Sequence, residues 1–228
     1  MLYNRSLMKI TFTLSVTAIS LALFGGANAS SITIETGFST AGPQIDAAAY
    51  QSVVDSAVAI PSIGYGIATP AIYDNISNHG LFAGGSTTDI AFKSTVDFYV
   101  SPANAGAWQI RAGVDFGHGG AIFVDGSAYD FKTNDMWWNG SYSDSSQYLS
   151  INTLNLAAGF HTLNLYGLEG CCDGGQQAQF RIGGTGDFTT FSTNDSLSPV
   201  PEPETYAMLL VGLGLIGFMV NRRKESAV

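Results

Sequence analysis

Apolar and polar side chains alternate along several short stretches of this chain, and this two-residue period constrains the fold more than any other feature. The segments 95–100 and 108–114 show the alternation most clearly. Successive side chains of a strand point to opposite faces of its sheet, so the period predicts strands with one buried face. Further strands are predicted at residues 31–35, 121–124, 148–156, 161–166, 178–182 and 188–191.

Turn and helix signals organise these strands into one fold class. The pairs Asp-Gly at 125–126 and Asn-Gly at 139–140 favour tight turns. Apolar residues recur at helical spacing between residues 44 and 58, which predicts one helix, with Pro43 suited to its first position and Pro61 to its end. Many short strands with one N-terminal helix predict a mainly β domain, an antiparallel, jelly-roll-like β-sandwich.

The first 29 residues predict a signal peptide. Two bases precede an apolar run at residues 10–24, and the Ala-Asn-Ala sequence at 27–29 has the small residues of a cleavage site. We expect this signal helix to be removed, so that the mature chain begins near Ser30. Residues 30–197 then suffice for one extracellular domain with a substantial core.

The C-terminal end combines three unlike elements in a fixed order. A linker at residues 198–205 contains Pro201, Glu202 and Pro203, an apolar segment occupies residues 206–221, and a basic tail at 222–228 contains Arg222 and Arg223. Proline cannot continue a helix or strand, so the Pro-Glu-Pro element predicts an exposed, extended tether. As a helix the apolar segment is short of the ~30 Å hydrocarbon core, and it predicts a thin transmembrane helix with its basic end in the cytoplasm.

This order of parts resembles the PEP-CTERM sorting tail of exported proteins from Gram-negative bacteria that make exopolysaccharide. The resemblance implies that an exosortase recognises Pro201 to Pro203. It also implies that the chain is anchored in the inner membrane before processing and then reaches the cell surface or extracellular matrix. An ordinary C-terminal anchor after a proline-containing linker is the alternative.

The charge of the predicted domain limits its partners. Between residues 30 and 200 there are four Lys and Arg against fifteen Asp and Glu, a formal charge of −11. Nucleic acid is disfavoured as a partner, because no basic patch exists to release its counterions. The acidic composition suits solubility outside the cell and also leaves carboxylates available for Ca²⁺.

A glycine-rich acidic loop carries the candidate ligand chemistry. Asp115 opens this loop, His118 lies among its glycines, and Asp125 ends the apolar strand that follows; the segment 156–163 later enters another strand by a tight turn. This order resembles the sugar-binding β-sandwich of the anthrax protective antigen and the yeast flocculins. The resemblance implies the fold and a sugar ligand.

Calcium stays open at the sequence level, and no other cofactor is expected. The calcium-binding members of that sandwich class have two consecutive aspartates in the first loop, whereas Phe116 follows Asp115 here. If Ca²⁺ binds, Asp115 and Asp125 are the predicted ligands. The three histidines show no spacing typical of metal ligands.

The tryptophan pair Trp137 and Trp138 has two interpretations, stacking on a sugar ring or packing within the β-structure. We predict that the acidic loop, the tryptophan pair and the cysteine loop gather at one end of the sandwich. The predicted sugar-binding residues are Asp115, His118, Asp125, Trp137, Trp138, Glu169 and Asp173.

The only cysteines, Cys171 and Cys172, are neighbours in a glycine-rich loop. In an oxidising compartment they form a vicinal disulfide, bond to another chain, or stay free. We favour the vicinal disulfide, which glycine-flanked backbone can accommodate. The Cys-Cys-Asp-Gly sequence together with the tail also resembles the CCXG class of PEP-CTERM proteins, which carries no established activity.

Three functions fit these observations. The first is a surface or matrix protein whose sandwich binds exopolysaccharide in a biofilm or floc, and the second is a structural matrix protein without a specific sugar ligand. The third is a glycoside hydrolase that uses a pair of its carboxylates. We expect a protein that is not an enzyme, because the sequence has no nucleophile elbow, phosphate loop or His-Glu-x-x-His motif.

Overall fold

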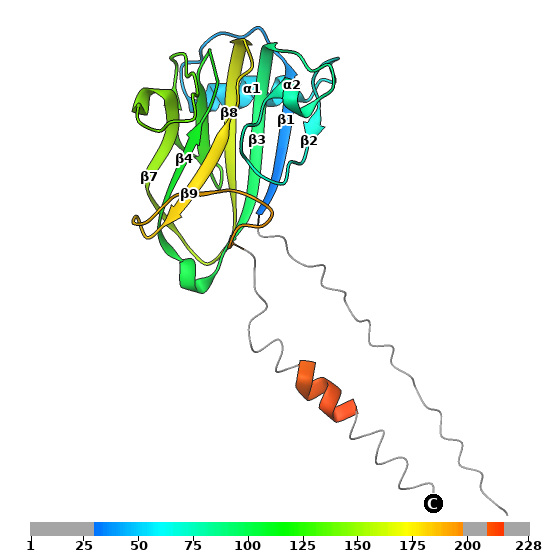
Figure 1. Ribbon diagram of the computed structural model, residues 1–228, viewed down its shortest axis with the longest axis vertical. Helices are drawn as coiled ribbons and strands as arrows, with labels where there is room; N and C mark the ends of the chain where they lie inside the picture. Colours follow the sequence, from blue (N-terminus) through cyan, green and yellow to red (C-terminus); the bar gives the residue numbers. More distant parts are fainter. Residues whose placement is uncertain (1–29, 198–208, 217–228) are drawn as a thin grey trace, which may run out of the picture.

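The computed structural model describes residues 30–197 and 209–216 of the chain (Figure 1). Residues 30–197 form two antiparallel sheets, a six-stranded one of order β2-β1-β3-β8-β5-β6 and a four-stranded one of order β10-β9-β4-β7. The strands are β1 (Ser30–Phe38), β2 (Ile67–Ala68), β3 (Thr88–Val100), β4 (Gly106–Gly113), β5 (Gly120–Val124), β6 (Ser127–Lys132), β7 (Tyr148–Leu156), β8 (Gly159–Cys171), β9 (Gln177–Ile182) and β10 (Thr189–Thr190). The mainly β, antiparallel fold predicted from the alternation is confirmed.

The longest strands, β3 and β8, define the two ends of the body. They pair antiparallel from Thr88 opposite Cys171 to Val100 opposite Gly159. At about 3.3 Å per residue, such a 13-residue strand is roughly 40 Å long. We call these ends the Cys171 end and the Gly159 end.

Alternate residues of the six-stranded sheet face two separate cores. Phe92 and Ile122 lie in the core between the two sheets, together with residues of β4, β7 and β9. Their chain neighbours Ala91 and Phe123 face the other way, against the helix α1 (Ala47–Val58). The helix therefore covers part of the outer face of this sheet. β5 is buried on both faces, whereas the outer face of β3 is buried at Ala91 and becomes exposed toward Asp97.

The helix begins later than the sequence predicts. Asp46 is its N-cap, and its Oδ1 accepts a hydrogen bond of 2.8 Å from the amide of Ala49, so the helix starts at Ala47 instead of residue 44. The expectation that Pro43 occupies the first helical position is wrong. The helix starts where the Asp46 carboxylate accepts a hydrogen bond from an amide that has no partner within the helix.

Several elements lack a periodic pattern and are absent from the predictions. Strand β6 is largely exposed, so apolar alternation does not mark it. The four-residue helix α2 (Asn78–Leu81) is too short to show apolar residues at helical spacing. The Asp-Gly turn at 125–126 is confirmed: Asp125 and Gly126 have φ of 50° and 75° and join β5 to β6.

Both ends of the body lie at the Gly159 end. Ser30 pairs with Phe98 on β3, and the Ser30 hydroxyl donates a 2.6 Å hydrogen bond to Asp195 near the last described residue of the body. In Figure 1 the start of β1, in blue, and the end of the body, in orange, lie at this same end. The chain therefore enters and leaves the body opposite the Cys171 end.

The predicted transmembrane helix stays a prediction. Residues 209–216 are helical, and no helix within the described ranges 30–197 and 209–216 has the length and apolar character needed to cross a membrane. The predicted signal peptide at 1–29, the Pro201-Glu202-Pro203 motif, and Arg222 with Arg223 lie outside the described residues.

Candidate functional site

An open cavity of about 600 Å³ lies at the Cys171 end of the body. Four segments that are distant in sequence build its wall: the β4–β5 loop, the loop after β6, the end of β8 with the loop that follows it, and the start of β3. The lining residues are Asp89, Asp115, Gly117, His118, Asp135, Trp137, Glu169, Gly170, Cys171, Cys172 and Gly174.

The glycine-rich β4–β5 loop is fixed to β8 by its backbone. The amide of His118 donates to the carbonyl of Leu168 at 2.9 Å, and the amide of Leu168 donates to the carbonyl of Gly119 at 3.1 Å. The Tyr50 hydroxyl of α1 adds a 2.7 Å bond to the His118 carbonyl. Gly119 has a φ of +79°, a conformation that favours glycine. The loop is therefore held rigidly over the end of β8.

The cavity wall also requires a glycine at position 170, because the His118 ring lies against the backbone there. A Cβ on Gly170 would lie 2.6 Å from Nε2 of His118, so the imidazole rests directly on the backbone of β8. The ring makes no hydrogen bond within residues 30–197 and stays half-exposed at the cavity wall. It is free to donate or accept one hydrogen bond to a ligand.

The side chains of Trp137 and Trp138 lie in different parts of the body. Trp137 follows Met136, which forms an antiparallel bridge with Phe116 of the β4–β5 loop. The side chain of Trp137 is 67% exposed and lines the cavity, and its amide donates a 2.6 Å bond to Oε1 of Gln147.

Trp138 instead packs on the outer face of the four-stranded sheet. A Cβ on Gly113 would lie 2.1 Å from the indole, and the Tyr142 ring centroid is 4.4 Å from that of Trp138. Of the two predicted sugar-binding tryptophans, Trp137 lines the cavity and Trp138 does not.

Glu169 is the most perturbed carboxyl group of the cavity. Its residue is 3% exposed, Oε2 accepts from the Gly117 amide at 2.5 Å, and Oε1 accepts from the Cys171 amide at 2.7 Å. Burial raises the pKa of Glu169 to about 7, although both amide hydrogen bonds lower it. Both oxygens are engaged with the backbone, so Glu169 clamps the β4–β5 loop to the end of β8.

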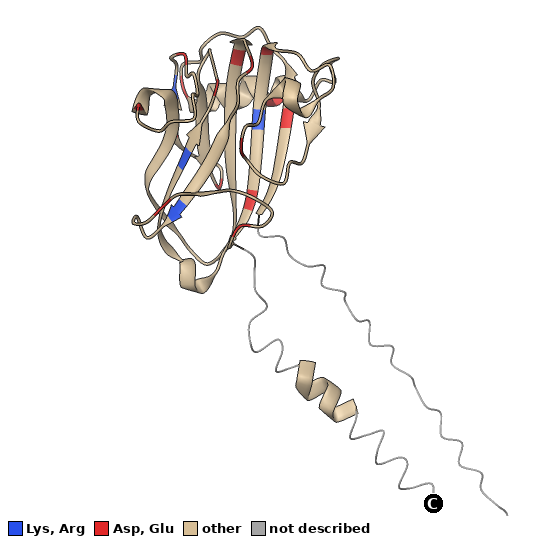
Figure 2. Cartoon of the chain, viewed as in Figure 1, with Lys and Arg blue, Asp and Glu red and all other residues tan. Residues whose placement is uncertain are grey.

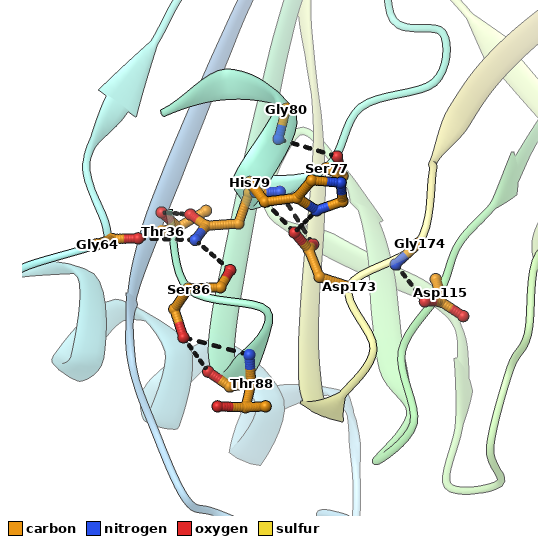
Figure 3. Close-up of polar contacts among 11 residues, drawn as sticks. Thr36, Gly64, Ser77, His79, Gly80, Ser86, Thr88, Asp115, Asp173 and Gly174 are labelled. Atoms are coloured by element: carbon orange, nitrogen blue, oxygen red, sulfur yellow. Dashed lines mark hydrogen bonds and ion pairs between the residues drawn. The ribbon is translucent and has the colours of Figure 1, made fainter. Parts of the chain in front are cut away.

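Asp115 has a comparable structural role. It is buried, and its Oδ2 accepts from the amide of Gly174 at 2.5 Å, which ties the β4–β5 loop to the loop after β8 (Figure 3). Burial raises the pKa of Asp115, and this amide bond opposes the rise. A Cβ on Gly174 would lie 2.5 Å from the same carboxylate oxygen.

Asp173 anchors the cysteine loop instead of lining the cavity. Its carboxylate is buried and accepts from the amides of Asn78 and His79 at 2.9 and 2.7 Å and lies 2.6 Å from Nδ1 of His79 (Figure 3). These atoms belong to the first residues of α2, where backbone amides have no partner within the helix. Asp173 is thus occupied by its own chain, in contrast to the predicted contact with sugar.

The two cysteines lie at the rim of the cavity as exposed thiols without a disulfide. Cys172 and Asp173 have φ of 81° and 24°, so the backbone turns sharply here without glycine. A hydrogen bond with the Cys172 thiol is the largest of the effects that raise the pKa of Cys171 to about 11. The predicted vicinal disulfide stays a prediction.

Asp125 does not join Asp115. It lies beyond Val124, which pairs with Leu163, whereas Gly120 at the cavity side pairs with Gly167. Its carboxylate instead lies 2.7 Å from Nδ1 of His161 toward the Gly159 end and accepts from the Thr162 amide at 3.0 Å. Asp115 and Asp125 therefore lie on either side of the five-residue strand β5, and Ca²⁺ binding by these residues stays a prediction.

Two further carboxylates line the cavity that the sequence analysis does not single out. Asp89 precedes the buried part of β3, with a φ of +55°, and Asp135 lies two residues before Trp137. Neither carboxylate makes a hydrogen bond within residues 30–197, in contrast to Asp115 and Glu169. The position of Asp135 two residues before Trp137 is a sequence signal that could have identified it as a site residue. Nothing local in the sequence marks Asp89.

The charged side chains of the cavity wall are acidic. Four carboxylates and no Lys or Arg line it. Figure 2 shows acidic positions at the ends of β3 and β8 that meet here. Among the described residues, no group of three or more His, Cys, Asp or Glu is arranged to hold a metal ion.

A smaller cavity of about 320 Å³ adjoins the first one. Asp135 and Trp137 line both cavities, and the rest of the smaller wall carries amide, hydroxyl and carboxylate groups from Asn139, Ser141, Ser143, Asp144 and Gln147. The exposed indole therefore stands between two hollows: the smaller one has a mainly polar wall, and the larger one combines carboxylates with apolar surface. Such a wall suits a ligand with many hydroxyl groups and apolar ring faces.

Comparison with protein families confirms the sorting tail predicted from the sequence. Residues 199–224 match the PEP-CTERM protein-sorting motif. The motif indicates an exported protein that is processed at the membrane. No curated protein sequence matches the chain.

Solved structures similar to the body include adhesin domains. A PA14 sugar-binding domain from an RTX adhesin is 14% identical with a TM-score of 0.48, and the match covers 72% of this chain and 96% of that one. The PA14 domain of the MpAFP antifreeze protein is 13% identical with a TM-score of 0.47, over 77% and 94% of the two chains. A subtype-switched Epithelial Adhesin 9 A domain from Candida glabrata, in complex with β-lactose, is 10% identical with a TM-score of 0.42, over 73% and 90%. Scores below 0.5 assign no ligand to this chain.

Proposed function

We propose that this chain is a surface or extracellular-matrix protein, processed by an exosortase, whose body binds a neutral polysaccharide in the cavity at the Cys171 end. The observation that carries the proposal is the exposed Trp137 between two hollows that share the unengaged carboxylate of Asp135, with that of Asp89 in the larger one. An indole face can stack on the apolar face of a sugar ring, while oxygen acceptors beside it bind the hydroxyl groups.

The four carboxylates of the cavity fall into two pairs with different roles, and this difference supports the proposal. Asp115 and Glu169 are buried and bonded to backbone amides, so they hold the loops in place. The carboxylates of Asp89 and Asp135 have no hydrogen-bond partner among residues 30–197 and can accept hydrogen bonds from sugar hydroxyls. Because the wall has no cation, an anionic sugar would be repelled, which favours a neutral one.

The direction of the cavity fits a protein attached through its C-terminal tail. The chain leaves the body at the Gly159 end, where Ser30 and Asp195 meet, and the sorting motif follows at residues 199–224. The cavity lies about 40 Å away at the opposite end of β3 and β8. A body attached in this way presents its cavity away from the membrane.

Binding is favoured over glycoside hydrolysis. The pKa of Glu169, about 7, is suitable for a general acid, but its two oxygens already accept hydrogen bonds from Gly117 and Cys171. A general acid must reach the glycosidic oxygen, and this carboxyl group is turned into its own backbone. Glu169 therefore acts as a clamp.

The test is retention of the full-length protein, kept in mild detergent, on an array of neutral and acidic glycans with and without Ca²⁺. We expect retention on neutral glycans, its loss in Trp137→Ala, and no dependence on Ca²⁺. The absence of retention on every glycan would favour the structural matrix protein. Fractionation of cells with and without the exosortase tests the sorting step separately, and unchanged location and size in both strains would contradict it.

A further inference from the structure

The outer face of the four-stranded sheet carries a cationic surface that contrasts with the rest of the body. Residues 30–197 contain four Lys and Arg side chains. Lys93 lies 2.9 Å from Asp55 and 3.5 Å from Glu35, and Lys132 lies 3.3 Å from Asp130. Arg111 and Arg181 have no carboxylate within 4 Å among the described residues.

The two arginines lie side by side on neighbouring strands. Arg111 of β4 is opposite Gln179 of β9, and Gln109 is opposite Arg181, so the guanidinium groups occupy diagonal positions on the same face. Figure 2 shows these two basic positions on β4 and β9. Diagonal side chains of paired strands start about 7–8 Å apart, so the two positive charges repel each other without a neutralising partner.

Neutral groups orient the guanidinium of Arg111. Its Nε and Nη2 donate to Oε1 of Gln179 at 2.8 and 2.6 Å, and its carbon lies 3.7 and 3.8 Å from the ring centroids of Tyr142 and Phe188. Nη1 makes no hydrogen bond within the described residues. A guanidinium has five N–H donors, so about three of those of Arg111 stay available in a fixed orientation.

Arg181 is held in the same way. Nε donates to Oε1 of Gln109 at 3.0 Å, Nη2 donates to the same oxygen, and Nη1 donates to the carbonyl of Gly186 at 3.1 Å. Its carbon lies 4.4 Å from the ring centroid of Phe188. About two donors of Arg181 therefore remain for a ligand.

We propose that this surface, consisting of Arg111, Arg181, Tyr142 and Phe188 with Gln109 and Gln179, binds the carboxylate groups of an acidic polysaccharide. In a domain with fifteen acidic residues, internal carboxylates are abundant, yet neither arginine uses one. An oriented guanidinium matches a carboxylate through two parallel hydrogen bonds. The adjacent rings and amides suit the faces and hydroxyl groups of sugar units.

This surface is separate from the proposed neutral-sugar cavity. Its aromatic end continues into Trp138, whose ring centroid is 4.4 Å from that of Tyr142, while the cavity is lined by Trp137. A polymer with one carboxylate per sugar unit can place two anions over the arginine pair. Since the body is acidic overall, we expect the contact to be short-ranged and weakened by salt.

The experiment measures binding of the full-length protein in mild detergent to polygalacturonate, with dextran as the neutral polymer, at low and physiological salt. We expect the double variant Arg111→Gln, Arg181→Gln to lose at least tenfold in affinity for polygalacturonate. Arg111→Lys keeps the charge but not the paired donors, and we expect a smaller loss. Trp137→Ala should leave polygalacturonate binding unchanged, which separates this surface from the cavity.

Lys132→Gln is the matched control, because it removes one positive charge that is already paired with Asp130. Equal loss in this variant and in Arg111→Gln would show attraction by net charge only and would overturn the proposal. Wild-type protein that does not bind polygalacturonate at low salt overturns it as well. Thermal unfolding shows whether each variant folds. If the double variant does not fold, the affinity of Arg111→Lys for polygalacturonate tests the proposal in its place.

Discussion

Phe116 and Met136 exchange two backbone hydrogen bonds, from the Phe116 amide at 2.9 Å and from the Met136 amide at 3.2 Å. Both side chains are fully buried, so the bridge is fixed from the core. The next residue, Trp137, is thereby held beside the glycine-rich loop, twenty residues away in sequence. This one pairing builds the cavity wall from two loops that have no strand in common.

Trp137→Ala should abolish most glycan retention without affecting the fold. The indole is 67% exposed, so its removal should change the free energy of unfolding by less than about 0.5 kcal/mol. A lost stacking contact of about 1.4 kcal/mol corresponds to a tenfold weaker affinity. Trp138→Ala is the comparison: it should lower stability by about 1–3 kcal/mol, because Trp138 packs on Gly113 and Tyr142. Titration and chemical denaturation of both variants test this, and the reverse ranking would contradict it.

Gly167→Ala should destabilise the body and loosen the β4–β5 loop. A Cβ at this position would lie 2.1 Å from the ring of Phe116, which is fully buried and cannot move freely. Overpacking of this kind costs about 1–3 kcal/mol. Gly42→Ala, which meets nothing within 4 Å, should leave the melting temperature nearly unchanged. Equal melting temperatures for the two variants would show that the loop is not held as described.

The stability of the protein should fall as the pH rises from about 4.5 to about 7. The ordinary pKa of a glutamate is 4.5 and burial raises that of Glu169 to about 7, so the folded protein binds more protons than the unfolded chain between these values. Stability is fully present below the lower value and is lost as the pH rises to the upper one. The loss is at most about 3 kcal/mol, and the raised pKa of Asp115 acts in the same direction.

Glu169→Gln should flatten this pH profile, leaving the smaller slope that Asp115 contributes. Denaturant unfolding between pH 4.5 and 8 measures it. Asp144→Asn is the matched control, because hydrogen bonds with Ser146 lower the pKa of Asp144 below this interval. A wild-type stability that increases over the interval would disprove the raised pKa of Glu169.

Asp173→Asn should destabilise the cysteine loop and α2 together. The carboxylate accepts hydrogen bonds from the amides of Asn78 and His79, and an amide NH₂ in its place would face these donors. We expect a loss of about 1–3 kcal/mol, measured by thermal unfolding, and faster hydrogen exchange at α2. The exposed residue Asp187 supplies a control substitution, Asp187→Asn, with little effect. Unchanged exchange at α2 in Asp173→Asn would contradict the anchoring role.

In reduced protein, Cys171 should react slowly with iodoacetamide at pH 8. A pKa of about 11 leaves only about one thiolate in a thousand at this pH. Cys172→Ala removes the hydrogen bond that is the largest cause of the rise, so the rate at Cys171 should increase. Mass spectrometry after timed alkylation measures both rates. Exported protein that takes up alkyl groups only after reduction would instead support the vicinal disulfide.

Local order along the chain was enough to predict the sorting tail, the strand segments and the acidic, glycine-rich loop. Each of these depends on residues that are close in sequence: three unlike elements in a row at the C-terminus, apolar residues at every second position, and glycines beside Asp115. The helix was predicted for the same reason, although the cap at Asp46 shifted its start.

Tertiary structure alone determines which residues line the cavity. Asp115 and Asp125 look equivalent in the sequence, but the five residues of β5 separate them along the sheet. Trp137 and Trp138 are neighbours, yet the bridge of Phe116 with Met136 directs only the first to the cavity. Asp89 joins the wall because β3 pairs with β8 in one register. Strand register and long-range backbone pairing depend on the packing of distant segments, and no local pattern encodes them.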